Sequence, residues 1–142
     1  MGILDKLSFQ WDSIGHVEGL VKEWRPRVCE SEKDYEKSLY KYLEKKLEGK
    51  EITKQHGVGR SKVDIAVGKK VFIEQKKDLK NTGQLQRLIG QLELYSKDLS
   101  DLIIILCGEV GKNLLNQLKD KVKSYDAGGL FIGGFDCRIL EK

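Results

Sequence analysis

The feature that most constrains this sequence is an unbroken apolar run, Leu102–Cys107, which reads Leu-Ile-Ile-Ile-Leu-Cys. A half-exposed strand alternates apolar and polar residues, whereas a strand buried on both faces is apolar throughout. The run is much shorter than the ~20 apolar residues that a membrane-spanning helix needs. We therefore expect Leu102–Cys107 to be an interior strand of a sheet that is covered on both faces.

The segments around this run predict alternating groups of helices and strands. Ser31 can cap the first helix, whose leucines recur every four residues until Gly49. The expected elements are a helix over Glu32–Glu48, strands at Glu51–His56, Val63–Val67 and Val71–Lys76, a helix from Asn81 or Thr82 to about Ser96, the strand Leu102–Cys107, a helix over Gly111–Tyr125, and a strand or hairpin within Gly128–Leu140. This order predicts an α/β fold with a central mixed β-sheet flanked by helices.

The N-terminal segment, residues 1–30, is expected to be separate from the domain formed by residues 31–142. Aromatic and aliphatic residues recur at nearly helical spacing from Leu7 to Trp24, and the single proline, Pro26, follows them. We expect an accessory helix here, or a contact between copies of the chain.

The composition limits the kinds of partner and compartment. The 142 residues carry a formal net charge of +4, which permits a nucleic-acid partner without demanding one. Met1–Gln10 has no apolar stretch typical of a signal peptide, so a cytoplasmic protein with no membrane partner is expected. The three cysteines are widely spaced and form no C-x-x-C pair, which argues against a structural zinc site, and they are too few for a four-cysteine iron–sulfur cluster.

Two acidic residues on neighbouring strands are the first candidates for chemistry. Glu74 and Lys76 are two residues apart and share a strand face, while Val63, Ile65, Val67, Val71 and Ile73 are expected on the other face. If the connecting turn has three residues, 68–70, Asp64 lies opposite Glu74 with the two Cβ atoms ~5 Å apart. A two-residue turn would instead place the two acids on opposite faces, and the sequence leaves both turns open.

Carboxylates brought this close repel each other unless a cation lies between them. Oxygen ligands suit a hard ion such as Mg²⁺ or Mn²⁺, which lowers the pKa of a bound water and polarises a phosphate. Lys76 could hold the water or a phosphate oxygen beside that ion and offset developing charge. The three residues Asp64, Glu74 and Lys76 therefore suit metal-assisted hydrolysis of a phosphodiester.

The spacing of these residues resembles the signature of the PD-(D/E)XK nuclease superfamily. Asp64 is followed after nine residues by Glu74-Gln75-Lys76, and Glu36 on the preceding helix resembles the metal-binding glutamate of that family. Gly57–Ile65 is similar to the glycine- and basic-rich segment of archaeal Holliday-junction resolvases. Gln91 and Tyr95 resemble the Gln-x-x-x-Tyr motif of RecB-type nucleases. Val63 stands where the family name has proline.

The resemblance implies a restriction-endonuclease-like fold with core order αβββαβ and a Mg²⁺-dependent nuclease acting on DNA. It implies metal ligands at Asp64, Glu74 and Glu36 and at the Gln75 carbonyl, and a catalytic role for Lys76. We expect DNA contacts at Arg60 and Lys62, and we expect Gln91 and Tyr95 to shape the site or to contact the DNA.

Little of the chain is left for reading bases, which favours structure-specific or weakly specific cutting, and cutting of branched or double-stranded DNA would imply a homodimer. Two alternatives stay open: an inactive nucleic-acid-binding module of the same fold, and an interaction domain that does not bind nucleic acid.

Overall fold

A mixed five-stranded sheet with strand order β1-β2-β3-β4-β5 forms the centre of the computed structural model, which describes residues 13–127 and 135–142. The strands are β1 (Ile52–Val58), β2 (Ser61–Val67), β3 (Val71–Leu79), β4 (Asp101–Val110) and β5 (Asp136–Glu141). β1, β2 and β3 pair antiparallel, whereas β3, β4 and β5 pair parallel. The predicted α/β class with a mixed sheet is confirmed.

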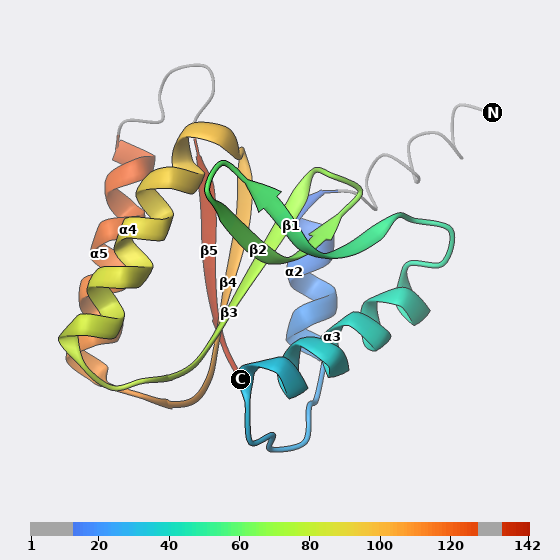
Figure 1. Ribbon diagram of the computed structural model, residues 1–142, viewed down its shortest axis with the longest axis horizontal. Helices are drawn as coiled ribbons and strands as arrows, with labels where there is room; N and C mark the ends of the chain where they lie inside the picture. The colour runs from blue at the N-terminus through green and yellow to red at the C-terminus, as the bar shows by residue number, and fades with distance from the viewer. Residues whose placement is uncertain (1–12, 128–134) are drawn as a thin grey trace.

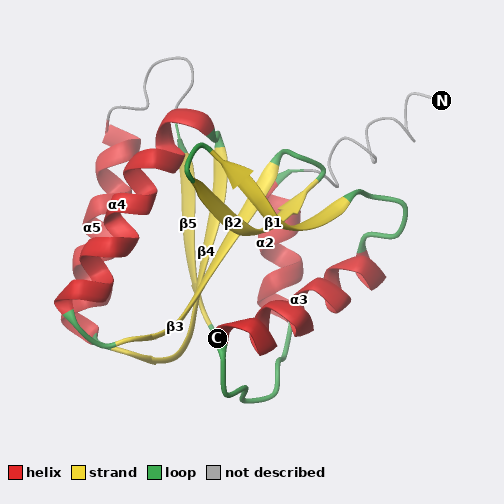
Figure 2. Cartoon of the chain, in the orientation of Figure 1, coloured by secondary structure: helices red, strands yellow, loops and turns green. Residues whose placement is uncertain are grey.

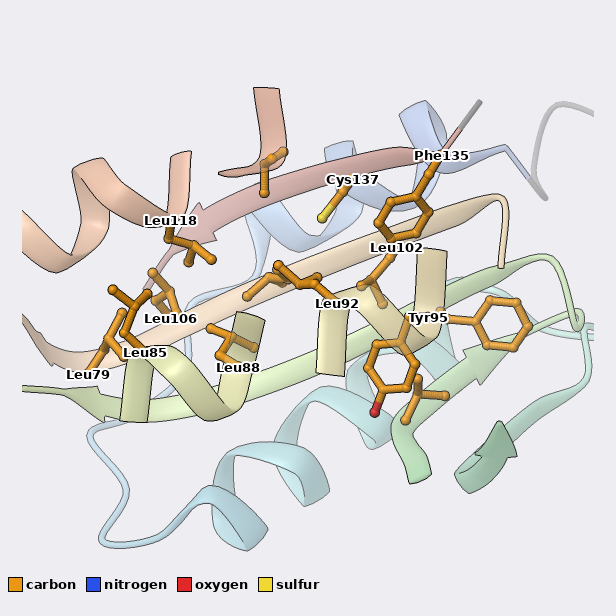
Figure 3. Packing of buried hydrophobic residues seen from close by; sticks show 14 of the residues in the cluster. Leu79, Leu85, Leu88, Leu92, Tyr95, Leu102, Leu106, Leu118, Phe135 and Cys137 are labelled. Atoms are coloured by element: carbon orange, nitrogen blue, oxygen red, sulfur yellow. The ribbon is translucent and has the colours of Figure 1, made fainter. Parts of the chain in front are cut away.

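Four described helices cover the two faces of this sheet, as Figures 1 and 2 show. The helices α2 (Ile14–Glu23) and α3 (Glu32–Lys46) lie on one face, and α4 (Thr82–Asp98) and α5 (Lys112–Ala127) lie on the other. Alternate residues of β4 supply both cores: Leu102, Ile104 and Leu106 pack toward α4 and α5, while Ile103 and Ile105 pack toward α2 and α3. β4 is thus the doubly buried strand that its apolar sequence predicts. Figure 3 shows the core beneath α4 and α5.

Two helices begin at the residues that the sequence indicates. The Ser31 side chain accepts a hydrogen bond from the Asp34 amide, and α3 starts at the next residue. Asn81 and Gln84 form a reciprocal capping box at the start of α4, which satisfies amides that the helix itself leaves unpaired.

The turn between β2 and β3 has three residues, and Val67 pairs with Val71 as the longer of the two turns requires. Gly68 and Lys69 both adopt left-handed backbone conformations, with φ of 59° and 55°. The pairing of β2 with β3 joins Val67 to Val71, Ala66 to Phe72 and Ile65 to Ile73, and it ends there. Beyond this point the two strands carry Asp64 and Glu74.

One prediction about β2 is wrong. Val63 does not share a face with Ile65 and Val67, which pack toward α3. It belongs to the core beneath α4, together with Ala66 and Phe72. The strict alternation of side chains therefore breaks between Val63 and Ile65, at the position of Asp64, where pairing with β3 has ended.

The N-terminal segment contributes to the core. Ile14, Val17 and Val21 of α2 and the following Trp24 are buried together with residues of α3 and the sheet. Leu7, Phe9 and Trp11, which the predicted N-terminal helix includes, lie outside the described residues. An intermolecular contact through this segment remains a prediction.

The C-terminal part of the chain forms one described strand. β5 lies parallel to β4 and pairs with it from Asp136 to Glu141, whereas residues 128–134 of the predicted strand or hairpin are not described. None of the described helices has the length and apolar character to cross a membrane.

Candidate active site

Asp64 and Glu74 lie where the antiparallel ladder between β2 and β3 stops. The Asp64 Oδ2 atom accepts a hydrogen bond of 2.7 Å from the backbone amide of Gln75. A carboxylate therefore takes the place that a backbone carbonyl of β2 would occupy if the ladder continued. This hydrogen bond holds the Asp64 side chain against β3, beside Glu74.

Glu74 is buried, with 3% of its surface exposed. Burial raises its pKa to about 8, and the negative charge of Asp64 and a hydrogen bond with that carboxyl group add to the rise. A hydrogen bond from Tyr95 and the positive charge of Lys76 act in the opposite direction. The two acids thus form a close pair in which a proton on Glu74 relieves the repulsion.

Tyr95 of α4 holds Glu74 from the side of the helix. Its hydroxyl lies 2.8 Å from Glu74 Oε2, 3.1 Å from the Lys62 carbonyl and 3.1 Å from Ser61 Oγ. Tyr95 has one phenolic proton, and it can donate that proton to Glu74. The Ser61 hydroxyl can then donate its own proton to the Tyr95 oxygen. Burial and the nearby carboxylates raise the pKa of Tyr95, which keeps it protonated as a donor.

Glu36 is connected to the pair through a residue that the sequence did not indicate, Gln55. The Gln55 amide donates to Glu36 Oε1 at 2.9 Å and to Asp64 Oδ1 at 3.3 Å. Gln55 also has a left-handed backbone with φ of 53°, a conformation that costs energy in a residue other than glycine. Gln55 faces Asp64 because of the register in which β1 pairs with β2. The sequence alone does not give this register.

Lys76 lies on the same face of β3 as Glu74, as predicted, and it is partly buried. Its side chain lines a cavity of about 250 Å³ together with Arg87 and Gln91 of α4. Gln91 and Tyr95 thus face β3 from one side of α4. The Gln91 Oε1 atom is buried and has no hydrogen-bond partner among the described residues.

Arg60 and Lys62 have exposed side chains at and after the turn between β1 and β2. The backbone carbonyl of Lys62 joins this segment to Tyr95. Neither basic side chain contributes to the group formed by Asp64, Glu74 and Tyr95.

The site fits a hard divalent cation through two of its acids. No group of three or more His, Cys, Asp or Glu side chains within residues 13–127 and 135–142 could hold a metal ion, so Glu36 does not join Asp64 and Glu74 in one cluster. The two paired carboxylates do fit, since a cation would replace the proton that their repulsion retains. The Gln75 carbonyl supports this fit, because it points to the same side of β3 as the Gln75 amide that contacts Asp64.

In comparisons with known proteins, no family model, curated protein or solved structure matched this chain.

Proposed function

We propose that this chain is a metal-dependent deoxyribonuclease with a restriction-endonuclease-like fold of the PD-(D/E)XK type. One observation carries the proposal: Asp64 and Glu74 form a close carboxyl pair at the end of a strand ladder, with Lys76 on the same face of β3. Placing two carboxyl groups this close with one of them buried is costly, and strongly shifted acids of this kind cluster at functional sites.

Each residue then has a specific role. Asp64 and Glu74 hold Mg²⁺ or Mn²⁺, with the Gln75 carbonyl as a further oxygen ligand, and Glu36 supports the site through Gln55. When bound, such an ion would supply Lewis-acid polarisation of the phosphate and a water of lowered pKa. Lys76 positions the attacking water and offsets the negative charge that develops on the phosphate. Tyr95 holds the Glu74 carboxylate in one orientation by its hydrogen bond.

DNA is the proposed substrate. Arg60 and Lys62 are exposed cations close in sequence to Asp64, and Gln91 lies on the helix face that meets Lys76. Such side chains suit phosphate contacts, which position a nucleic acid without reading its sequence. We therefore expect cutting that depends on DNA structure more than on sequence, by a homodimer in the cytoplasm.

The test is to incubate linear, flap and four-way-junction DNA with the full chain, with Mg²⁺, with Mn²⁺ or with EDTA. Cleavage is expected with either metal and is expected to disappear with EDTA. Glu74→Gln should reduce cleavage to background while DNA affinity changes little. The matched control is Glu48→Gln, which removes a carboxylate from an exposed position after α3 and should cut normally.

Two outcomes would overturn the nuclease assignment. Salt-dependent DNA binding without cleavage of any substrate would favour an inactive nucleic-acid-binding module. Failure to bind DNA at low salt would favour an interaction domain of another kind.

A further inference from the structure

A cavity of about 250 Å³ lies between β3 and the first half of α4, beside the candidate active site. Its lining includes Lys76, Lys77, Arg87, Gln84, Gln91 and Glu32, so three cations face one carboxylate. Lys76 connects the cavity with the acids, because its charge also lowers the pKa of Glu74.

The existing contacts show which of these groups are available for a ligand. The Lys77 ammonium is paired with Asp78 at 2.5 Å, and Glu32 Oε1 accepts a hydrogen bond from the Lys77 amide at 2.9 Å. In contrast, neither Lys76 nor Arg87 forms an ion pair with a carboxylate of the described residues. The two cations without such a partner are therefore Lys76 and Arg87.

The neutral side chains add donors to the same cavity. Gln84 Oε1 is used by the backbone amides of Lys80 and Asn81, which leaves the Gln84 NH₂ group as the part that can donate. Arg87 uses Nε to contact the Gly83 carbonyl at 3.4 Å, so its two terminal nitrogens remain for a ligand. Gln84 lies in the first turn of α4, where the helix dipole favours an anion, and Arg87 follows three residues later.

We propose that this cavity binds a phosphate group of DNA adjacent to the one that is cut, with Arg87 as the main ligand, Gln84 as a further donor and the charge of Lys76 adding to the attraction. The inference rests on the proposed function for the identity of the ligand. A guanidinium with two free nitrogens matches two phosphate oxygens, and an ammonium on the other wall completes the neutralisation. The phosphate can be a diester within the DNA or a monoester at its end.

The experiment measures binding without catalysis, in EDTA, by the full chain. The probes are a short blunt duplex with hydroxyl ends and the same duplex with 5′- or 3′-phosphates, each titrated at several salt concentrations. Arg87→Gln is expected to weaken binding about tenfold and to reduce the salt slope by about one. Arg87→Lys keeps the charge and should recover part of the lost affinity.

Lys119→Gln is the matched control, because it removes one positive charge from an exposed position on α5. It is expected to bind with the affinity of the original chain. An equal loss for Arg87→Gln on all duplexes assigns an internal diester, and a loss confined to phosphorylated duplexes assigns a terminal monoester. Unchanged affinity and salt slope for Arg87→Gln on every probe would overturn the proposal.

The two proposals can fail separately. A chain that binds DNA through Arg87 but never cuts it would contradict the nuclease assignment and leave the phosphate site intact. A chain that cuts DNA, and whose Arg87→Gln variant binds every probe normally, would keep the nuclease and remove the phosphate site.

Discussion

The Tyr95 hydroxyl donates a hydrogen bond of 2.8 Å to Glu74 Oε2 and so connects α4 to β3 at the candidate site. Tyr95 is fully buried, and its ring belongs to the core that packs beneath α4 and α5 (Figure 3). The orientation of the Glu74 carboxylate therefore depends on the packing of an entire helix. Substitutions of Tyr95 should therefore alter cleavage, although Tyr95 has no proposed contact with the scissile bond.

Tyr95→Phe tests this dependence. The lost hydrogen bond helps to lower the pKa of Glu74, so its removal should raise that pKa further above 8. The pH profile of metal-dependent cleavage should move to higher pH, and the free energy of unfolding should fall by about 1–2 kcal/mol because buried acceptors lose their donor. Cleavage rates across pH and urea denaturation measure the two effects.

Tyr125→Phe is the control for this change. The Tyr125 hydroxyl lies 3.1 Å from Glu93 on an exposed part of α4, away from the paired acids. It should leave the pH profile unchanged. An identical profile for Tyr95→Phe would contradict the role of the hydrogen bond.

The raised pKa of Glu74 predicts how stability depends on pH in metal-free buffer. Glu74 has a pKa of about 8 in the folded chain, against an ordinary value of 4.5. The folded state therefore binds the Glu74 proton more tightly than the unfolded state does. The contribution of Glu74 to the free energy of unfolding is fully present below pH 4.5 and is lost as the pH rises from there through 8. Between these two pH values, the free energy of unfolding should fall by ~1.4 kcal/mol per pH unit.

Glu74→Gln should abolish that dependence and be more stable than the original chain at pH 8. Mg²⁺ should stabilise the original chain at pH 8 and leave the glutamine variant unaffected. Urea denaturation at several pH values, with EDTA or Mg²⁺, provides the comparison. Parallel stability curves for the two proteins in EDTA would contradict the assigned pKa.

Two substitutions of Gln55 separate its backbone strain from its hydrogen bonds. Gln55→Ala and Gln55→Gly both remove the amide that joins Glu36 to Asp64, so both should weaken Mg²⁺-dependent cleavage to a similar degree. Only glycine relieves the left-handed conformation, and Gln55→Gly should therefore be more stable than Gln55→Ala by about 1 kcal/mol. Equal stability of the two variants, or normal cleavage by either, would contradict this account.

Gly108 in β4 should tolerate no side chain. It has φ of 76°, and a Cβ atom would lie 2.3 Å from Asp78 Oδ1, which accepts a hydrogen bond from the Glu109 amide. Gly108→Ala should destabilise the chain by about 2 kcal/mol or more. Gly90→Ala places the same methyl group in open space within α4 and should stabilise by up to about 1 kcal/mol. Thermal and urea unfolding of both variants would show opposite shifts.

Much of the fold follows from local rules. The capping residues Ser31 and Asn81 mark the starts of α3 and α4, and the apolar run in β4 identifies the doubly buried strand. The turn after Val67 fixes the register that brings β2 and β3 together, and it is the three-residue turn, one of the two that the sequence leaves open. These features depend on neighbours in sequence, which explains why they can be predicted.

Features that depend on tertiary geometry could not be predicted in the same way. Strand alternation placed Val63 on the wrong face, because it assumes regular pairing and the pairing of β2 with β3 ends at Ile65. Gln55 carries no signal in sequence, since its role comes from a left-handed backbone and from contacts with two other elements. The catalytic and metal-binding roles of Asp64, Glu74 and Lys76 remain predictions.

The hydrogen bond from the Gln75 amide to Asp64 makes one backbone proton a reporter of the proposed site. In a regular ladder, this proton would be shielded from solvent by a carbonyl whose charge never changes. Here the acceptor is a side-chain carboxylate, which can turn away from the amide toward a cation. At a fixed pH, the protection of the Gln75 amide against exchange with deuterium should therefore change when Mg²⁺ is added, while the amides of β4 beside it remain protected.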